Sequence, residues 1–154
     1  MKGTYCLIIE VKKKSTLKVG RLGQVEFKPG FYIYVGSALN SLESRVKRHL
    51  SSKKKIHWHI DYLLVDSSSK IKEVIYSVGE EKIECSVASL ILDKSSTVAR
   101  FGSSDCRCES HLFYFEEYDK AQNVVLNSFE ELGLSAKNLD DFNQISNRKT
   151  SKNN

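Results

Sequence analysis

The sequence predicts a small α+β domain in which a mostly antiparallel sheet, with three core strands plus a fourth, is flanked by helices. Short runs rich in β-branched and aromatic residues alternate with segments whose apolar residues recur at helical spacing. Their coarse order is β-β-α-α-β-α-β-α without an internal repeat, which suits a layered α+β domain. A chain of 154 residues with 40% hydrophobic residues is also sufficient for one domain with a real core.

The first two strands are predicted by their composition. Residues 3–11 are rich in β-branched and aromatic types, and they predict a buried strand. Residues 24–27 and 31–35 predict a broken second strand that is interrupted at Pro29-Gly30, which is typical of a turn or a bulge. An antiparallel pairing of the two would bring Tyr5 and Tyr34 onto neighbouring strands.

The later elements follow from apolar periodicity and from turn residues. In chain order they are a helix near 39–50, a helix over 56–65, a strand over 71–78, a helix from about 81 to 91, a strand over 110–115 and a helix over 120–132. Gly133 then stands at the position where a glycine commonly ends a helix. Residues 95–109 are dense in Ser, Gly, Asp and Cys, and they predict a loop.

The domain is expected to span residues 1–142. Beyond it, residues 143–154 are dominated by Asn, Ser, Lys and Gln, and they predict a disordered polar tail.

The formal net charge of +5 favours an anionic partner. Lysine clusters at 12–14 and 53–55 indicate either loops that line a basic face or solvated turns kept soluble by charge. No stretch approaches the length of apolar sequence that spans a membrane, and the chain start lacks a signal-peptide pattern. We therefore expect a cytoplasmic protein without a membrane partner, whose four cysteines are thiols or metal ligands rather than disulfides.

Two short strings carry the chemistry, Gly3-Thr4-Tyr5 and Tyr34-Val35-Gly36, and Arg45 and His49 follow four residues apart on one predicted helix. Each is common by chance, and a single tyrosine on a strand is more often a core aromatic with a hydrogen-bonded hydroxyl. In this order, on two strands and a helix, they indicate a site for cutting phosphodiester bonds.

Phosphodiester hydrolysis needs an activated water, charge neutralisation on the phosphoryl oxygens and help for the leaving oxygen. Arg45 is permanently charged, and its planar fork matches two phosphate oxygens at once. A tyrosine could accept a proton from water only as phenolate, which costs about 4 kcal/mol at pH 7 for a free phenol. A divalent cation and the guanidinium would lower that cost.

These strings resemble those of the GIY-YIG nuclease superfamily, over about residues 3–92. The chain looks more closely like an archaeal, uncharacterised branch, a domain of unknown function that is sometimes fused to an endonuclease III-type repair glycosylase. Residues 55–63 (Lys-Ile-His-Trp-His-Ile-Asp-Tyr-Leu), the pair Glu84-Cys85 and residues 102–113 carry this closer resemblance.

The resemblance implies a small antiparallel sheet with the two named strings on its first two strands. It implies that Tyr5 is the base or the water-orienting group, that Tyr34 orients water or phosphate, and that Arg45 is the helix arginine. His49 falls where some branches carry a helix histidine, which could share proton transfer. The family also uses one helix glutamate to hold Mg²⁺ or Mn²⁺, and Glu84 is the choice here.

A cluster of cysteines and histidines leaves three interpretations open. A structural Zn²⁺ site would use Cys106, Cys108, His111 and Cys85, although the usual Cys-x-x-Cys pairs are missing. A metal-free network that shapes the wall of the active site would instead place Asp105, His57 and His111 near the phosphate. The third interpretation is a set of unrelated buried thiols and histidines.

Within the predicted second helix, His57 and Asp61 stand four apart and face one way. They predict either an oriented histidine, at a metal or in catalysis, or a structural hydrogen-bonded pair.

The sequence therefore predicts a metal-dependent endonuclease acting on DNA, with RNA not excluded, in DNA repair or processing, with a repair glycosylase or another repair protein as a partner. Backbone phosphates would be contacted by Arg48, Lys53, Lys54, Lys55, Lys12 and Lys13. The alternative is a non-catalytic nucleic-acid-binding module, stabilised by zinc. A structural or protein-binding domain is the third interpretation.

Overall fold

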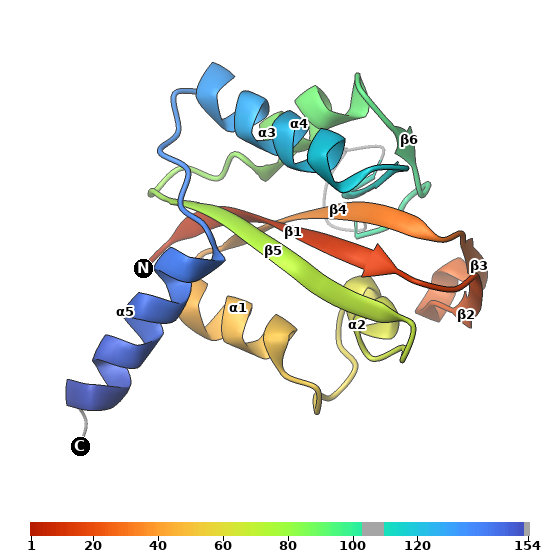
Figure 1. Cartoon of the computed structure of the whole chain (residues 1–154), viewed down its shortest axis with the longest axis horizontal. Helices are drawn as coiled ribbons and strands as arrows, with labels where there is room; N and C mark the ends of the chain where they lie inside the picture. Colours follow the sequence, from red (N-terminus) through yellow and green to blue (C-terminus); the bar gives the residue numbers. More distant parts are fainter. Residues whose placement is uncertain (103–109, 153–154) are drawn as a thin grey trace.

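Five strands form one antiparallel sheet through the middle of the molecule (Figure 1). The computed structural model describes residues 1–102 and 110–152, with side chains described as far as residue 146. In sheet order the strands are β5 (Ser69–Val78), β1 (Gly3–Val11), β4 (Gly30–Ala38), β7 (Leu112–Phe115) and β6 (Ser96–Thr97). The predicted α+β class is confirmed, and the short edge strand β6 is an addition in a segment predicted as loop.

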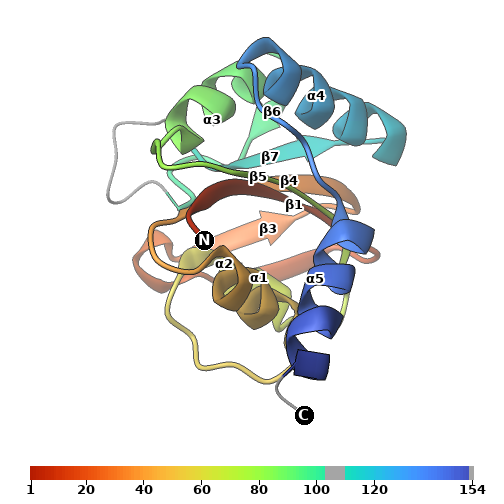
Figure 2. The same ribbon diagram turned by 90° about the vertical axis from the view of Figure 1, so that its left-hand side faces the viewer.

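Helices cover both faces of this sheet (Figure 2). On one face lie α1 (Leu42–Leu50) and α2 (His59–Leu64), and on the other lie α3 (Glu84–Leu92) and α4 (Tyr118–Glu131). Gly133 follows α4 with a φ of 71°, so it ends the helix as predicted. In the described ranges no helix is both long and apolar enough to cross a membrane.

Each face of the sheet has its own core, because side chains alternate along a strand. From β1, Leu7 and Ile9 point toward α1 and α2, whereas Cys6 and Ile8 point toward α3 and α4. All four side chains are fully buried. Burial of an aliphatic side chain of this size contributes about 1.5–3 kcal/mol to stability.

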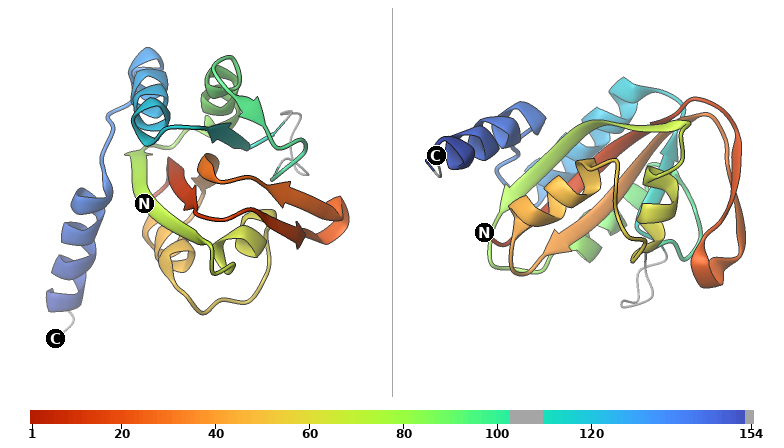
Figure 3. Two further views of the ribbon diagram at one scale, coloured as in Figure 1. Left: turned by 45° about the vertical axis from the view of Figure 1, so that its right-hand side comes forward. Right: turned by 90° about the horizontal axis from the view of Figure 1, so that it is seen from below.

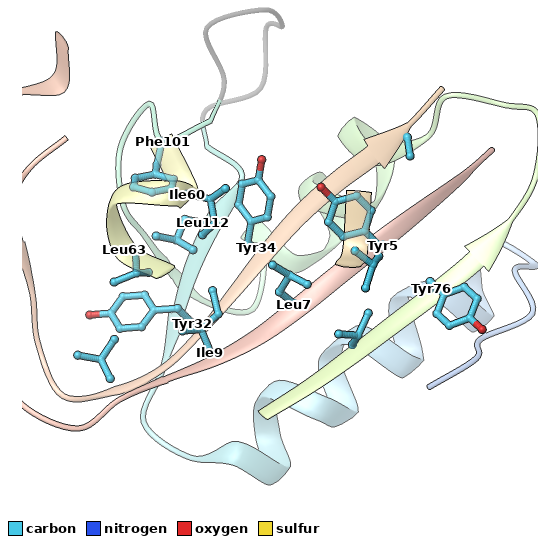
Figure 4. Packing of buried hydrophobic residues seen from close by; sticks show 14 of the residues in the cluster. Tyr5, Leu7, Ile9, Tyr32, Tyr34, Ile60, Leu63, Tyr76, Phe101 and Leu112 are labelled. Atoms are coloured by element: carbon cyan, nitrogen blue, oxygen red, sulfur yellow. The ribbon is translucent and has the colours of Figure 1, made fainter. Parts of the chain in front are cut away.

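The register of β1 and β4 brings the two motif tyrosines to the same face. Tyr5 pairs with Gly36, and Tyr34 pairs with Leu7. Both phenols belong to the core on the α1 and α2 side, with their ring centroids 6.4 Å apart. Figure 4 shows them projecting from neighbouring strands toward the same side.

The glycines of the two motifs are required for close packing. A Cβ at Gly36 would lie 2.5 Å from Cζ and from the hydroxyl oxygen of Tyr5. A Cβ at Gly3 would lie 2.5 Å from the carbonyl oxygen of Ser77 and 2.9 Å from Cδ2 of Leu42. The motif glycines therefore have a steric reason that is independent of any chemistry.

A second, two-stranded sheet is formed by β2 (Ser15–Lys18) and β3 (Gln24–Phe27), joined through the 3₁₀ turn η1 (Gly20–Leu22). It lies at one end of the main sheet, as Figure 3 shows. The structure thus corrects the prediction that residues 24–27 continue into the second core strand. They pair with β2 because the chain turns at Pro29 before β4 begins.

The tail predicted to be disordered from residue 143 differs in the structure, where the helix α5 (Leu139–Lys152) continues through it. The helix begins with a capping pair, because the Asn138 backbone N–H donates to the Asp141 carboxylate and the Asp141 N–H donates to the Asn138 side chain. Phe142 is buried against Tyr76, with ring centroids 6.1 Å apart. This anchored first turn supplies the nucleus that the polar composition alone does not.

We predict that Gly36→Ala destabilises the fold, because the new methyl group would overlap the Tyr5 ring. The free energy of unfolding in urea should fall by on the order of 1–3 kcal/mol, as in other overpacked cores. Gly79→Ala is the matched control, since a Cβ at Gly79 meets nothing within 4 Å. Equal stability of the two variants would show that the Tyr5 ring moves aside without cost.

Candidate active site

An open pocket of about 330 Å³ lies where β4 ends. Its lining includes Tyr34 from β4, Arg45 from α1 and Glu84 from α3, three of the five predicted catalytic residues. Tyr5 and His49 lie in the core beside it, with exposed fractions of 1% and 2%. The pocket is therefore built from both helical layers, which meet around the end of the sheet.

Helix α1 places Arg45 at the pocket. The helix begins after Ser41, whose hydroxyl caps it by accepting the N–H of Ser44. The guanidinium of Arg45 donates to the Ser37 carbonyl oxygen at 3.1 Å and lies 4.4 Å from the Trp58 ring centroid. Arg45 is thus held by one backbone acceptor and one aromatic ring, and it keeps further N–H donors for a ligand.

Tyr5 and His49 form a buried hydrogen-bonded pair, with 2.7 Å between the Tyr5 hydroxyl and Nε2 of His49. Burial raises the pKa of Tyr5 well above its ordinary value, Tyr34 raises it further, and the charge of Arg45 lowers it in part. Burial lowers the pKa of His49 to about 3, with a further decrease from the ammonium of Lys54. At neutral pH the pair therefore consists of a neutral phenol and a neutral imidazole.

Tyr34 is the motif phenol that reaches the pocket. Its ring centroid lies 6.0 Å from that of His49 and 6.4 Å from that of Tyr5. Burial raises the pKa of Tyr34 to about 12, although the positive charge of Arg45 opposes the increase. The structure thus brings the two phenols, the imidazole and the guanidinium into one cluster, as predicted.

The buried carboxylate of Asp61 fixes the chain segment that packs against Arg45. Asp61 has no exposed surface and accepts two hydrogen bonds from the Arg48 guanidinium, at 2.8 and 2.7 Å. It also accepts the backbone N–H groups of His57 and Trp58, both at 2.9 Å. Burial alone would raise the pKa of Asp61, but Arg48 and the two N–H groups lower it below its ordinary value. Asp61 therefore remains a carboxylate and fixes the segment that carries Trp58.

Two predictions are corrected by this arrangement. His57 precedes α2 and bonds to Asp61 through its backbone N–H, so the two do not form the side-chain pair predicted within a helix. Arg48, predicted to contact phosphate, is committed to Asp61 and to the Lys55 carbonyl oxygen, and it lies over Trp58 at 4.4 Å. A guanidinium held by a buried carboxylate satisfies more of its donors than solvated phosphate contacts would.

Glu84 is the predicted cation ligand, and it stands at the first residue of α3. Its carboxylate is largely buried, with Oε1 3.5 Å from the Lys82 ammonium and Oε2 without a hydrogen-bond partner among the described residues. A buried carboxylate oxygen without a donor is costly, and a hard cation with its waters would satisfy it. Glu84 therefore fits Mg²⁺ or Mn²⁺ held by one carboxylate. Across the described part of the chain, no group of three or more His, Cys, Asp or Glu side chains is arranged to hold a metal ion.

Two of the four predicted zinc ligands, Cys106 and Cys108, lie outside the described residues, as does Asp105 of the predicted metal-free network. His111 is buried at the pocket, and its Nδ1 lies 3.0 Å from the Val35 carbonyl oxygen. Cys85 is disulfide-bonded, which differs from the predicted thiol or zinc ligand. A sulfur already bonded to another sulfur has no thiolate to offer a metal.

The predicted phosphate-contacting lysines fall into two separate groups. Lys53 and Lys55 are exposed in the loop after α1, where the Lys54 ammonium donates to the His49 carbonyl oxygen at 2.6 Å. Lys12 and Lys13 are exposed beyond the far end of β1, at the opposite end of that strand from Tyr5. The pocket and the second lysine group therefore do not form one continuous site.

Sequence reasoning assigned no role to Trp58, which lines the pocket beneath Arg45. Its signal was present, since it is the only tryptophan of the chain. Reasoning also missed Gly102, whose N–H donates to Nδ1 of His59 at 2.9 Å. Gly102 has a φ of 69°, and a Cβ there would lie 3.3 Å from the Tyr34 ring. No sequence periodicity could predict that contact, because the two residues are far apart in the chain.

Comparison with known proteins gives one match. A family model described as "Domain of unknown function DUF123" matches residues 4–134. That span contains both motif tyrosines, the four helices that cover the sheet and the whole pocket. No curated protein and no solved structure matches the chain.

We predict that His49 makes stability depend on pH. The unfolded imidazole has a pKa near 6.5, and the folded one about 3. Between these values the unfolded chain binds more protons, so the free energy of unfolding falls as the pH decreases, by up to about 1.4 kcal/mol per pH unit. Urea denaturation from pH 7 to 4 should show a steeper loss for the wild type than for His49→Gln.

The control for loss of an imidazole is His57→Gln, at an exposed position. If the free energy of unfolding of the wild type and of His49→Gln depends on pH in the same way, His49 has the same pKa in the folded and unfolded states.

Proposed function

This chain belongs to the DUF123 family, and we propose that it is a nuclease of the GIY-YIG type, which hydrolyses phosphodiester bonds in DNA with a divalent cation. One observation carries the proposal. Tyr34, Arg45 and Glu84 line a single pocket, and the Tyr5–His49 hydrogen bond lies directly beside it. These are the residues that the resemblance to GIY-YIG nucleases requires, and they come from four different elements.

Arg45 is the group that would bind the scissile phosphate. Its guanidinium is fixed by the Ser37 carbonyl oxygen and by the ring of Trp58, so little side-chain freedom is left to lose on binding. A phosphoryl group develops charge on its oxygens in the transition state, and a positioned guanidinium stabilises that charge.

Tyr34 is the phenol that would contact the attacking water. With a pKa of about 12 it starts as a neutral phenol, and ionising it at pH 7 would cost about 7 kcal/mol. It therefore first orients the water through its hydroxyl oxygen. Tyr34 thus keeps its predicted role of orienting water, whereas the predicted role of Tyr5 as base changes, because Tyr5 is too deeply buried to reach the pocket in this conformation.

Tyr5 and His49 would support Tyr34 from the core. The hydrogen bond of 2.7 Å between the Tyr5 hydroxyl and Nε2 of the neutral imidazole fixes the phenol that packs beside Tyr34. Glu84 would hold the divalent cation, which supplies positive charge that stabilises the phosphoryl oxygens and makes bound water more acidic.

DNA is the proposed substrate, with RNA as a second possibility and DNA repair or processing as the setting. The net charge of +5 supports a polyanionic ligand, as do Arg45 and Lys82 in the pocket lining, where Glu84 is the one acidic residue among those that the structure describes.

The burial of Tyr5 favours a second candidate function. A phenol with 1% exposure, bonded to a buried neutral histidine, is also what a purely structural core pair would be. In that case the protein would bind nucleic acid at the same pocket without cutting it.

The first experiment is cleavage of branched, nicked and single-stranded DNA in Mg²⁺ or Mn²⁺. Tyr34→Phe and Arg45→Ala should each lower the rate by about 100-fold or more, the usual effect of losing an acid–base or charge-stabilising group. Glu84→Gln should lower the rate and raise the cation concentration needed for half-maximal rate.

Two controls match these variants. Tyr118→Phe changes a phenol on the opposite face of the sheet, and Lys47→Ala removes an exposed cation from α1. Binding without cleavage by the wild type, on every substrate and with either metal, would overturn the nuclease and leave the binding module.

A second prediction concerns pH. Below the Tyr34 pKa of about 12, the ionised fraction rises tenfold per pH unit. The cleavage rate at saturating cation should therefore increase from pH 6 to 9, and this increase should be shallower in Tyr34→Phe. Identical pH profiles would remove Tyr34 from proton transfer while leaving Arg45 as a phosphate ligand.

A further inference from the structure

Two segments of the chain are strongly basic, residues 45–55, which include Arg45, and residues 12–28. Residues 12–28 contain six basic residues and one acidic residue, a net charge of +5 that equals that of the whole chain. The remaining residues therefore contain as many acidic as basic side chains. These seventeen residues comprise β2, η1 and β3 with their flanking turns. We call residues 12–28 the basic arm.

The basic side chains of the arm face solvent. All six are exposed: Lys12, Lys13, Lys14, Lys18, Arg21 and Lys28. Lys14 lies 3.4 Å from the Glu26 carboxylate, and Lys28 lies over the Tyr114 ring. The ion pairs found among the described residues involve none of the other four.

The arm is fixed to the body. Val19 and Phe27 are fully buried, and the Phe27 ring packs edge-on against Tyr32 and Phe101, at 5.8 and 6.1 Å. Gly20 lies against the Tyr62 side chain of α2. The position of its charges relative to the pocket is therefore set by the fold.

We infer that the basic arm is a docking surface for the phosphate backbone of a DNA duplex, separate from the pocket. This rests on the proposed function, because the same duplex would carry the phosphate that enters the pocket. Clustered exposed lysines and arginines supply the sequence-independent part of DNA binding, and a two-stranded ribbon has a width that the major groove admits. The exposed large apolar side chains of the described residues include none from the arm, so a lipid bilayer would gain nothing to bury there.

The length of β1 also sets the distance between the basic arm and the pocket. Tyr5, which lies beside the pocket, and Lys12, the first residue after β1, are seven residues apart, which corresponds to roughly 23 Å of extended chain. Phosphates of one strand follow each other at about 3.4 Å along the duplex axis, so the arm would lie about 7 base pairs from the pocket. Binding should therefore weaken when the duplex is too short to reach both.

The experiment is binding of a fluorescein-labelled duplex of about 24 base pairs, by anisotropy in EDTA, across a range of salt concentrations. The arm variant Lys13→Gln/Lys18→Gln/Arg21→Gln should bind at least about tenfold more weakly, and the slope of log K against log salt should decrease by about 2–3, because each phosphate contact contributes about 0.9. The matched control is Lys94→Gln/Lys120→Gln/Lys137→Gln, which removes the same charge from exposed positions elsewhere. It should retain the wild-type slope.

Two outcomes would overturn the proposal that the arm binds DNA. One is an unchanged slope of log K against log salt in the arm variant, and the other is an equal loss of affinity in the control variant. A duplex of about 6 base pairs, too short to span roughly 23 Å, should bind the wild type more weakly than the 24-base-pair duplex and with a smaller salt slope, because it cannot reach the arm and the pocket together. EDTA prevents cation-dependent cleavage, so the result does not depend on activity. If binding depends on the arm but no DNA is cleaved, only the nuclease proposal is overturned. If cleavage depends on Tyr34 but the arm variant keeps the wild-type slope of log K against log salt, only the proposal that the arm binds DNA is overturned.

Discussion

The close approach of the Tyr5 ring to the backbone of β4 is the constraint on which the site depends. It is possible only because residue 36 has no side chain, since a Cβ there would lie 2.5 Å from the phenol. With the ring in that position, its hydroxyl reaches Nε2 of His49 on α1. The strand register then places Tyr34 on the same face. The missing side chain at residue 36 thus allows β1, β4 and α1 to place their site residues around the pocket.

A second interaction keeps the pocket wall in place. The Asp61 carboxylate accepts both N–H donors of Arg48 and two backbone N–H groups, so a buried charge is fully compensated. The bonded segment carries Trp58, whose ring contacts the guanidiniums of both Arg45 and Arg48. The string His-Trp-His-Ile-Asp is therefore structural support for Arg45.

The pocket combines a basic and an acidic side chain that come from helices on opposite faces of the sheet. Arg45 comes from α1 on one face of the sheet, and Glu84 comes from the start of α3 on the other. They meet because the sheet ends between them, beyond Gly36. The pocket could thus bind a phosphate at the Arg45 guanidinium and a metal cation at the Glu84 carboxylate, side by side. A direct ion pair between Arg45 and Glu84 would instead neutralise both side chains. The basic arm, with its net charge of +5, lies at the other end of the sheet.

The sequence by itself determined the elements that local patterns encode: the strands from their composition, α1 from its apolar spacing, and the presence of Arg45 and His49 on one helix. It also supplied the order of the two tyrosine motifs. Only the tertiary structure decided that Arg48 is bound to Asp61 and that Tyr34, rather than Tyr5, reaches the pocket. Such choices depend on contacts between residues distant in the chain, and periodicity contains no information about which distant partner a side chain meets.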